Sequence, residues 1–188
     1  MPTTLSGKRV AVLVSHGFEQ VEMTSPRDAL IRAGAIVEIV SPERGAVKGW
    51  KHTDWGESFT VDRPLETVEA DDYDALVLPG GQMNPDTLRT NPQAVKLIRA
   101  FAAAHKPIAA ICHAPWLLVE AGLVHGLRAT SYASIRTDLI NAGAHWQDAE
   151  VVEDRGIVTS RNPDDLPAFN RAMVLAIAAS PVEVATTS

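Results

Sequence analysis

The chain has 188 residues, which fits a single domain, and 46% of them are hydrophobic, which is enough for one substantial core. The net charge of −6 gives no basic face for a nucleic-acid backbone, so we expect no nucleic-acid partner. The longest apolar run, Ala172 to Ala179, is too short to cross a bilayer, and the N-terminus has no hydrophobic signal segment. We therefore expect a cytoplasmic protein with no membrane partner.

Cys112 is the only cysteine of the sequence, so no intramolecular disulfide can form and no Cys-x-x-Cys pair is present to hold zinc. We expect neither a metal nor a cofactor. A lone thiol in such a protein is usually a small buried apolar residue, so a chemical role for Cys112 has to be argued from its surroundings.

The first third of the chain predicts a βαβ unit. Arg9 to Ser15 is a short apolar run typical of a buried strand, and Ile36 to Ser41 predicts the next one. Between them, Ser25 as cap and Pro26 as first residue predict a helix that ends at Gly34. The following polar stretch is interrupted by glycines, and within it Ser58 to Asp62 alternates like a strand.

The remaining chain continues the alternation of strands and helices. Strands are predicted over 75–78, 108–111 and, as a hairpin, 151–152 with 157–160, and helices over 92–105, 114–121, 135–142 and 167–179. We expect one domain over 1–188, with a core over about 8–179 and a frayed tail over 180–188. This order predicts an α/β fold: an open, mostly parallel sheet with helices on both faces.

Ligands of such sheets bind beyond the carboxyl ends of the strands. Three polar or glycine-rich segments are predicted to converge there, namely His16 to Glu19, Gly80 to Asp86, and Cys112 with His113. This convergence is the first indication of a functional site.

Cys112 lies where a predicted strand passes into a predicted helix without a spacer. A sharp turn of this kind presents a nucleophile above the sheet, and it places the sulfur at a helix N-terminus, where N–H groups stabilise a thiolate. The small residues Ala110 and Ala114 leave room for the bend. A buried structural thiol is the alternative interpretation.

Gly80 and Gly81 directly follow a predicted strand. Two glycines there allow backbone N–H groups to face a ligand, as an oxyanion hole requires, although an ordinary β-turn also explains them. Their spacing does not fit a dinucleotide-binding or phosphate-binding loop.

Glu19 follows the first predicted strand and is the candidate acid beside Cys112. Because two neighbouring anions repel, one of the pair should hold a proton, and a protonated Glu19 could donate to the thiolate. The alternative for Glu19 is a solvated glutamate at a helix start, a description that suits Glu22 better.

His113 and Asp86 could form a relay with Cys112, in which the carboxylate orients the imidazole. Side chains of adjacent residues often diverge at a turn, so the relay is an open hypothesis at this point.

Taken jointly, these motifs resemble PfpI-type intracellular proteases, in the superfamily that includes the parkinsonism-associated deglycase and class I glutamine amidotransferases. The resemblance covers about Lys8 to Ile177 and rests chiefly on Gly17-Phe18-Glu19, Ala75 to Gly81, and Ala110 to His113. Ala114 departs from the pattern, because the group usually has glycine after Cys-His.

The resemblance implies a flavodoxin-like three-layer sandwich that assembles into homodimers or hexamers. The implied roles are Cys112 as nucleophile, Glu19 as the acid that stabilises its thiolate, His113 as the histidine, and Gly80 with Gly81 as oxyanion donors. In protease-like members an acidic residue of a neighbouring subunit completes a triad, and Asp86 is the matching position. Amidotransferases add a downstream His-x-Glu pair, which this sequence lacks after Cys112.

The resemblance therefore implies a stress-response cysteine enzyme that acts on small reactive carbonyls, as a glyoxalase or protein deglycase. The first alternative is an intracellular cysteine peptidase, active as an oligomer on peptides. The second is a redox sensor or holdase chaperone, in which Cys112 is oxidised without turnover.

Overall fold

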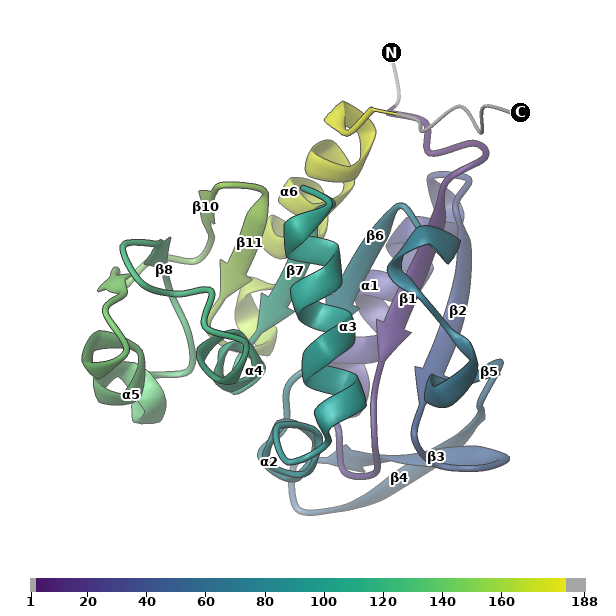
Figure 1. Ribbon diagram of the computed structural model, residues 1–188. Coiled ribbons are helices and arrows are strands. Elements are labelled where there is room, and N and C mark those ends of the chain that lie inside the picture. The colour runs from purple at the N-terminus through teal and green to yellow at the C-terminus, as the bar shows by residue number, and fades with distance from the viewer. Residues whose placement is uncertain (1–2, 182–188) are drawn as a thin grey trace.

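A seven-stranded sheet forms the centre of the computed structural model, which describes residues 3–181 (Figure 1). In spatial order its strands are β10 (Val152–Asp154), β11 (Ile157–Ser160), β7 (Ile108–Ile111), β6 (Ala75–Leu78), β1 (Arg9–Leu13), β2 (Ile36–Ser41) and β5 (Arg63–Pro64). Every neighbouring pair is parallel except β10 and β11. Two small sheets pair β3 (Ala46–Lys51) with β4 (Asp54–Thr60), and β8 (Arg128–Ala129) with β9 (His145–Trp146).

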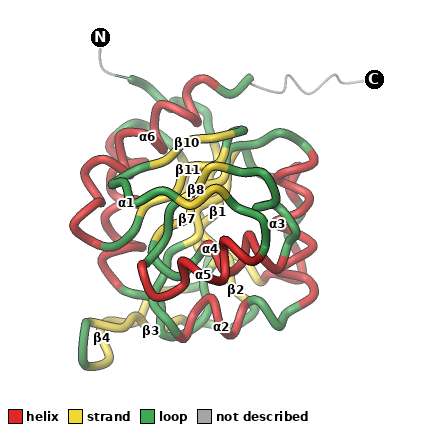
Figure 2. The backbone as a smooth tube through the Cα atoms, turned by 90° about the vertical axis from the view of Figure 1, so that its left-hand side faces the viewer, coloured by secondary structure: helices red, strands yellow, loops and turns green. Residues whose placement is uncertain are grey.

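Helices cover both faces of the central sheet, as Figure 2 shows from the side. The α-helices are α1 (Gln20–Arg32), α2 (Met83–Leu88), α3 (Pro92–Ala103), α4 (Pro115–Glu120), α5 (Arg136–Asn141) and α6 (Leu166–Ala179). Helices α1 and α6 pack on one face, and α3 and α4 on the other. Side chains alternate along β1, so that Val10 and Val12 pack in the core under α1 and α6, and Ala11 and Leu13 pack in the core under α3 and α4.

The predicted α/β architecture is confirmed, and several elements have the bounds that the sequence predicted. Strands β2, β6, β7 and β11 begin and end where expected, and β10 with β11 forms the predicted hairpin. The polar segment after β2 holds the two-stranded hairpin of β3 and β4 instead of the single strand predicted there. Of the predicted tail, residues 182–188 lie outside the described residues.

The first helix begins earlier than predicted. We placed its cap at Ser25 and its first residue at Pro26, whereas α1 begins at Gln20 and contains Pro26 in its interior. Proline prefers the first helical position because it lacks an N–H, but here it is buried on the face that α1 turns toward the core. The extra turn carries Glu22 into the interior, which matters for the site.

None of the helices within residues 3–181 combines the length and the apolar composition needed to cross a membrane.

The three segments predicted to converge at the carboxyl ends of the strands do meet. The N–H of Glu19 donates to the carbonyl of Gly80 at 3.3 Å. A Cβ atom added to Gly80 would lie 2.6 Å from the Cβ of Cys112. One added to Gly81 would lie 2.6 Å from the Glu19 nitrogen. The loop after β6 is therefore packed between the start of α1 and the end of β7, with no room for side chains.

This packing predicts different costs for two alanine substitutions at glycines with nearly the same backbone. Gly81 has φ of +77° and Gly122 has φ of +74°, but a Cβ at Gly122 would have no neighbour within 4 Å. Gly122→Ala should cost only the strain of positive φ, about 1 kcal/mol. Gly81→Ala should cost about 3 kcal/mol or more, because it also displaces the backbone of residues 17–19. Urea unfolding of both variants measures the difference, and equal losses would contradict it.

Candidate active site

Cys112 occupies the sharp turn that the sequence predicted between β7 and α4. Its φ of +65° is a left-handed backbone conformation that residues other than glycine rarely adopt. Two backbone hydrogen bonds hold it: the Cys112 N–H donates to the Ser160 carbonyl at 3.0 Å, and its carbonyl accepts from the Tyr132 N–H at 2.8 Å. The residue is only 6% exposed, so the thiol is held in a fixed, largely dry position.

The carboxyl group next to this thiol belongs to Glu22 and not, as we expected, to Glu19. Glu22 is fully buried in the first turn of α1. Its Oε1 accepts a hydrogen bond from the Gly80 N–H at 3.1 Å, and the carboxyl lies within hydrogen-bonding reach of the Cys112 thiol. Within residues 3–181, Oε2 accepts no hydrogen bond, so it is the oxygen on which a proton can be held.

Glu19 points away from the sulfur toward the β3–β4 hairpin. Its Oε1 accepts from the His52 N–H at 3.3 Å and lies 3.9 Å from His52 Nδ1. The backbone gives the reason. Glu19 is the extended residue before α1, with φ of −61° and ψ of 116°, whereas Glu22 lies inside the helix on the inward face that it shares with Pro26 and Leu30. Glu19 stays close enough for its charge to act on Glu22.

Cys112 and Glu22 are a coupled pair that cannot both be charged. Burial, and then the charge of Glu19, raises the pKa of Glu22 to about 8. Burial and then an ionised Glu22 raise the pKa of Cys112, whereas the N–H groups of Gly81 and His113 lower it. The helix-terminal position alone had predicted a lowered thiol pKa, and burial opposes it. The pair therefore holds at least one proton near neutral pH.

His113 contacts the sulfur, so the two adjacent side chains do not diverge. Its Nδ1 lies 3.2 Å from Cys112 Sγ, and its Nε2 lies 3.2 Å from the hydroxyl of Ser134. The ring stacks on Tyr132 and meets the edge of Trp116. Burial lowers the pKa of His113, which favours the neutral imidazole.

The glycine pair is adjacent to the thiol, but its N–H groups are already engaged. The N–H of Gly80 donates to Glu22, so Gly80 is not the free oxyanion donor that we expected. The N–H of Gly81 acts on both the Glu22 carboxyl and Cys112, and that of His113 acts on Cys112. Two backbone donors thus point at the sulfur, where they stabilise a negative charge.

Asp86 does not form the expected relay within its own chain. It lies in the first turn of α2 with its side chain exposed, and its carboxylate makes no hydrogen bond or ion pair with any residue from 3 to 181. A contact with His113 of a neighbouring subunit stays a prediction.

Two functional positions were missed by the sequence interpretation besides Glu22. Buried Asn84 fixes the loop after β6 that contains Gly80 and Gly81, called here the glycine loop. Its Oδ1 accepts from the Ser15 N–H at 2.7 Å, and its Nδ2 donates to the Pro79 carbonyl at 3.0 Å. Ser134 contacts His113 from a segment 21 residues further along the chain. The signal for Glu22 was its spacing to Pro26 and Leu30, whereas no local pattern marks Asn84 or Ser134.

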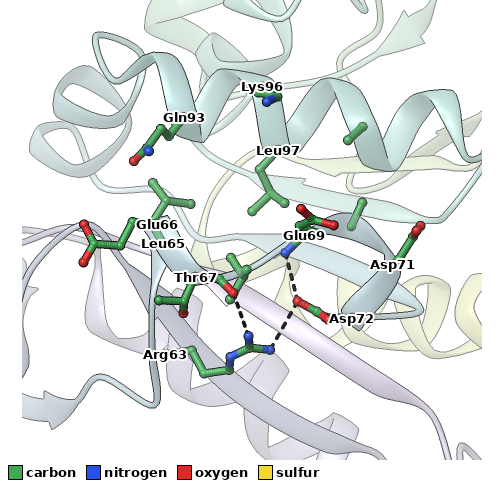
Figure 3. Close-up of a pocket in the computed structure, with 13 residues that line it drawn as sticks. Arg63, Leu65, Glu66, Thr67, Glu69, Asp71, Asp72, Gln93, Lys96 and Leu97 are labelled. Atoms are coloured by element: carbon green, nitrogen blue, oxygen red, sulfur yellow. Dashed lines mark hydrogen bonds and ion pairs between the residues drawn. The ribbon is translucent and has the colours of Figure 1, made fainter.

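A cavity of about 560 Å³ lies elsewhere, between α3 and the two 3-10 helices η1 (Leu65–Thr67) and η2 (Ala70–Asp72). Figure 3 shows that Arg63 is engaged there by Thr67 and Asp72. Its thirteen lining residues include neither Cys112 nor Glu22 nor His113. Within residues 3–181, no three His, Cys, Asp or Glu side chains gather as a metal site.

Known proteins share both the sequence and the fold. Putative cysteine protease YraA of Bacillus subtilis (strain 168) is 47% identical over 164 residues, which is 87% of this chain and 95% of that protein. Protein/nucleic acid deglycase 2 of Escherichia coli (strain K12) is 44% identical over 165 residues, 87% of this chain and 94% of that protein. The crystal structure of Drosophila melanogaster DJ-1beta superposes with a TM-score of 0.84 at 31% identity, covering 93% of this chain and 91% of that one.

The profile of the DJ-1/PfpI family matches residues 8–176, a range that includes every residue of the site described above. The chain therefore belongs to the DJ-1/PfpI family.

Proposed function

We propose that this protein is a cytoplasmic cysteine enzyme of the stress response that acts on reactive carbonyls, as a glyoxalase or protein deglycase. The observation that carries the proposal is the arrangement around Cys112. A carboxyl group with a raised pKa lies within hydrogen-bonding reach of the sulfur, and an imidazole nitrogen lies 3.2 Å from it.

The first step is the addition of a thiolate to a carbonyl carbon. One proton is placed on Glu22, whose carboxylic acid donates to the Cys112 thiolate together with the N–H groups of Gly81 and His113. The sulfur lone pair forms the S–C bond, and the C=O π electrons move to oxygen. The oxygen takes the proton of Glu22, which leaves a neutral hemithioacetal and a Glu22 carboxylate.

The two backbone donors serve the adduct as well as the thiolate. Once the sulfur is bonded to carbon it no longer carries a charge, and the N–H groups of Gly81 and His113 are released for the adduct oxygen. The imidazole of His113 lies beside the new bond and is the group placed to move protons in the later steps.

Carbonyl chemistry is favoured over peptide hydrolysis by the partner of His113. A peptidase needs an imidazole oriented as a base, commonly by a carboxylate, whereas the Nε2 of His113 contacts the hydroxyl of Ser134. The relative in Escherichia coli is named a deglycase, and the one in Bacillus subtilis a putative cysteine protease. We propose self-association into a homodimer or hexamer, in which Asp86 is the residue to examine at the interface.

The proposal predicts that the protein consumes methylglyoxal and that this activity depends on Cys112. Replacement of the nucleophile should lower kcat/KM by about a thousandfold or more, because no other thiol can form the adduct. The measurement is the loss of methylglyoxal by wild type and by Cys112→Ala, with casein cleavage assayed on the same samples. Casein cleavage alone would identify a peptidase. Oxidation of Cys112 with no turnover of either substrate would identify a redox sensor.

The proton on Glu22 predicts the thiol acidity of three variants. The proposed thiolate requires that iodoacetamide alkylation of wild type have a midpoint below the ordinary thiol value of about 8.5, so the donors around the sulfur must outweigh the burial that raises the pKa of Cys112. Glu22→Gln keeps a donor and should titrate near wild type, whereas Glu22→Ala removes it and should raise the midpoint. The comparison variant is Glu19→Gln, which removes a charge that raises the pKa of Glu22 but leaves the carboxyl group beside the thiol in place. A midpoint lowered by Glu22→Ala would mean that Glu22 is ionised at rest.

The same proton predicts an alkaline limit to the activity. Because the pKa of Glu22 is raised to about 8, its acid form is present below pH 8 and is lost as the pH rises through that value. Turnover should therefore fall above about pH 8 in wild type. Glu22→Gln cannot lose this proton, so its profile should lack that decline. A decline at the same pH in both proteins would assign it to another group.

A further inference from the structure

We propose that Ser134 is a positioning residue for His113, whose hydroxyl donates to Nε2 and keeps the proton of the neutral ring on Nδ1, facing Cys112. This inference rests on the proposed function, because it assumes a thiolate at rest. It assigns to the same chain the support of the histidine that the sequence had led us to seek in Asp86.

The geometry places a partner at each nitrogen of the ring. Nδ1 lies 3.2 Å from Cys112 Sγ, and Nε2 lies 3.2 Å from Ser134 Oγ. Tyr132 stacks on one side, with ring centroids 4.6 Å apart and an interplanar angle of 24°. Trp116 approaches with its centroid at 5.2 Å. The imidazole is thereby held in one orientation, in which both nitrogens are engaged.

Ser134 is brought to this position by the sharp turn at Cys112, the elbow between β7 and α4. The N–H of Tyr132 donates to the Cys112 carbonyl at 2.8 Å, which fixes the segment against the turn. The 3-10 helix η3 (Ala133–Ile135) follows directly and is anchored by the buried side chain of Ile135. Ser134 lies at its middle, so the distance from its hydroxyl to Nε2 is set by the same hydrogen bond that holds Cys112.

A hydroxyl group suits a thiolate site better than a carboxylate would. A neutral imidazole carries one proton, and a lone pair on Nδ1 would repel a thiolate 3.2 Å away. A carboxylate at Nε2 only accepts hydrogen bonds, so it would draw the proton to Nε2. The hydroxyl of Ser134 can donate to Nε2 and leave the proton on Nδ1, where it stabilises the sulfur anion.

Which nitrogen of His113 carries the proton is decided by its two direct partners and not by the charged groups around it. Glu22 lies behind Cys112 on α1, and the phenol of Tyr132 faces the ring from the segment before η3. On the far side of Trp116, Arg89 stacks on the indole and Asp138 accepts from its Nε1. Within residues 3–181, His113 makes no ion pair with a carboxylate. Burial without such a partner favours the neutral ring, whose pKa is lowered.

The test is the tautomer of His113, read from long-range ¹H–¹⁵N spectra of protein labelled at histidine and assigned with His113→Gln. In wild type we expect Nδ1 to be protonated and Nε2 to show the shift of an unprotonated nitrogen. Ser134→Thr keeps a hydroxyl and should retain this pattern. Ser134→Ala should move the proton toward Nε2 and slow the alkylation of Cys112 by about twofold to tenfold, the effect of one hydrogen bond. Ser134→Asp should place the proton on Nε2.

Two controls separate this role from a general effect of mutation and from a neighbouring subunit. Thr137→Ala changes an exposed hydroxyl on the next turn, in α5, and should alter neither the spectrum nor the alkylation rate. The proposal is overturned if Nε2 is protonated in wild type, or if Ser134→Ala leaves the spectrum unchanged. A spectrum that changes with Asp86→Ala instead would assign the role to a carboxylate of a second subunit.

The alkylation midpoint of wild type distinguishes a failure of the role of Ser134 from a failure of the proposed thiolate mechanism. A midpoint below about 8.5 with a proton on Nε2 would reject the role of Ser134 and leave the carbonyl enzyme standing. A midpoint at or above that value, together with a proton on Nε2, would reject the thiolate mechanism and the role of Ser134 alike.

Discussion

The site depends on one electrostatic constraint: Glu22 and Cys112 are both buried and close together, so only one of them can be charged. Burial raises the pKa of both groups, the charge of Glu19 raises that of Glu22 further, and an ionised Glu22 raises that of Cys112. The N–H groups of Gly81 and His113 lower the pKa of the thiol and so oppose the effect of burial. In the reaction that we propose, they hold a thiolate beside a carboxylic acid.

The rest of the fold keeps this pair in contact. Parallel strands bring their carboxyl ends to one edge, and there the glycine loop after β6 fits between α1 and the elbow because it has no side chains. Asn84 fastens that loop to the end of β1 through the Ser15 N–H. The positive φ of Cys112 is sustained by hydrogen bonds from two further segments of the chain. The left-handed backbone at Cys112 costs stability, and these hydrogen bonds offset that cost.

Beside the sulfur, the imidazole of His113 has a polar partner at each nitrogen, and neither partner is a carboxylate. In a triad, the carboxylate draws a proton to the far nitrogen and turns the near nitrogen into a base. A hydroxyl at the far nitrogen leaves the near one free to be a donor. The surroundings of this histidine therefore suit the thiolate addition that we propose.

The sequence by itself determined the α/β architecture, most strand bounds, the elbow at Cys112 and the glycine loop, because each follows from apolar runs and turn residues close together in the chain. It did not determine which glutamate faces the sulfur. A proline signal placed the helix start near Pro26, whereas packing extends α1 back to Gln20 and turns Glu22 inward. Only the tertiary structure could bring Ser134 to His113, and only burial decides where one proton is held, because both depend on contacts between segments far apart in the chain.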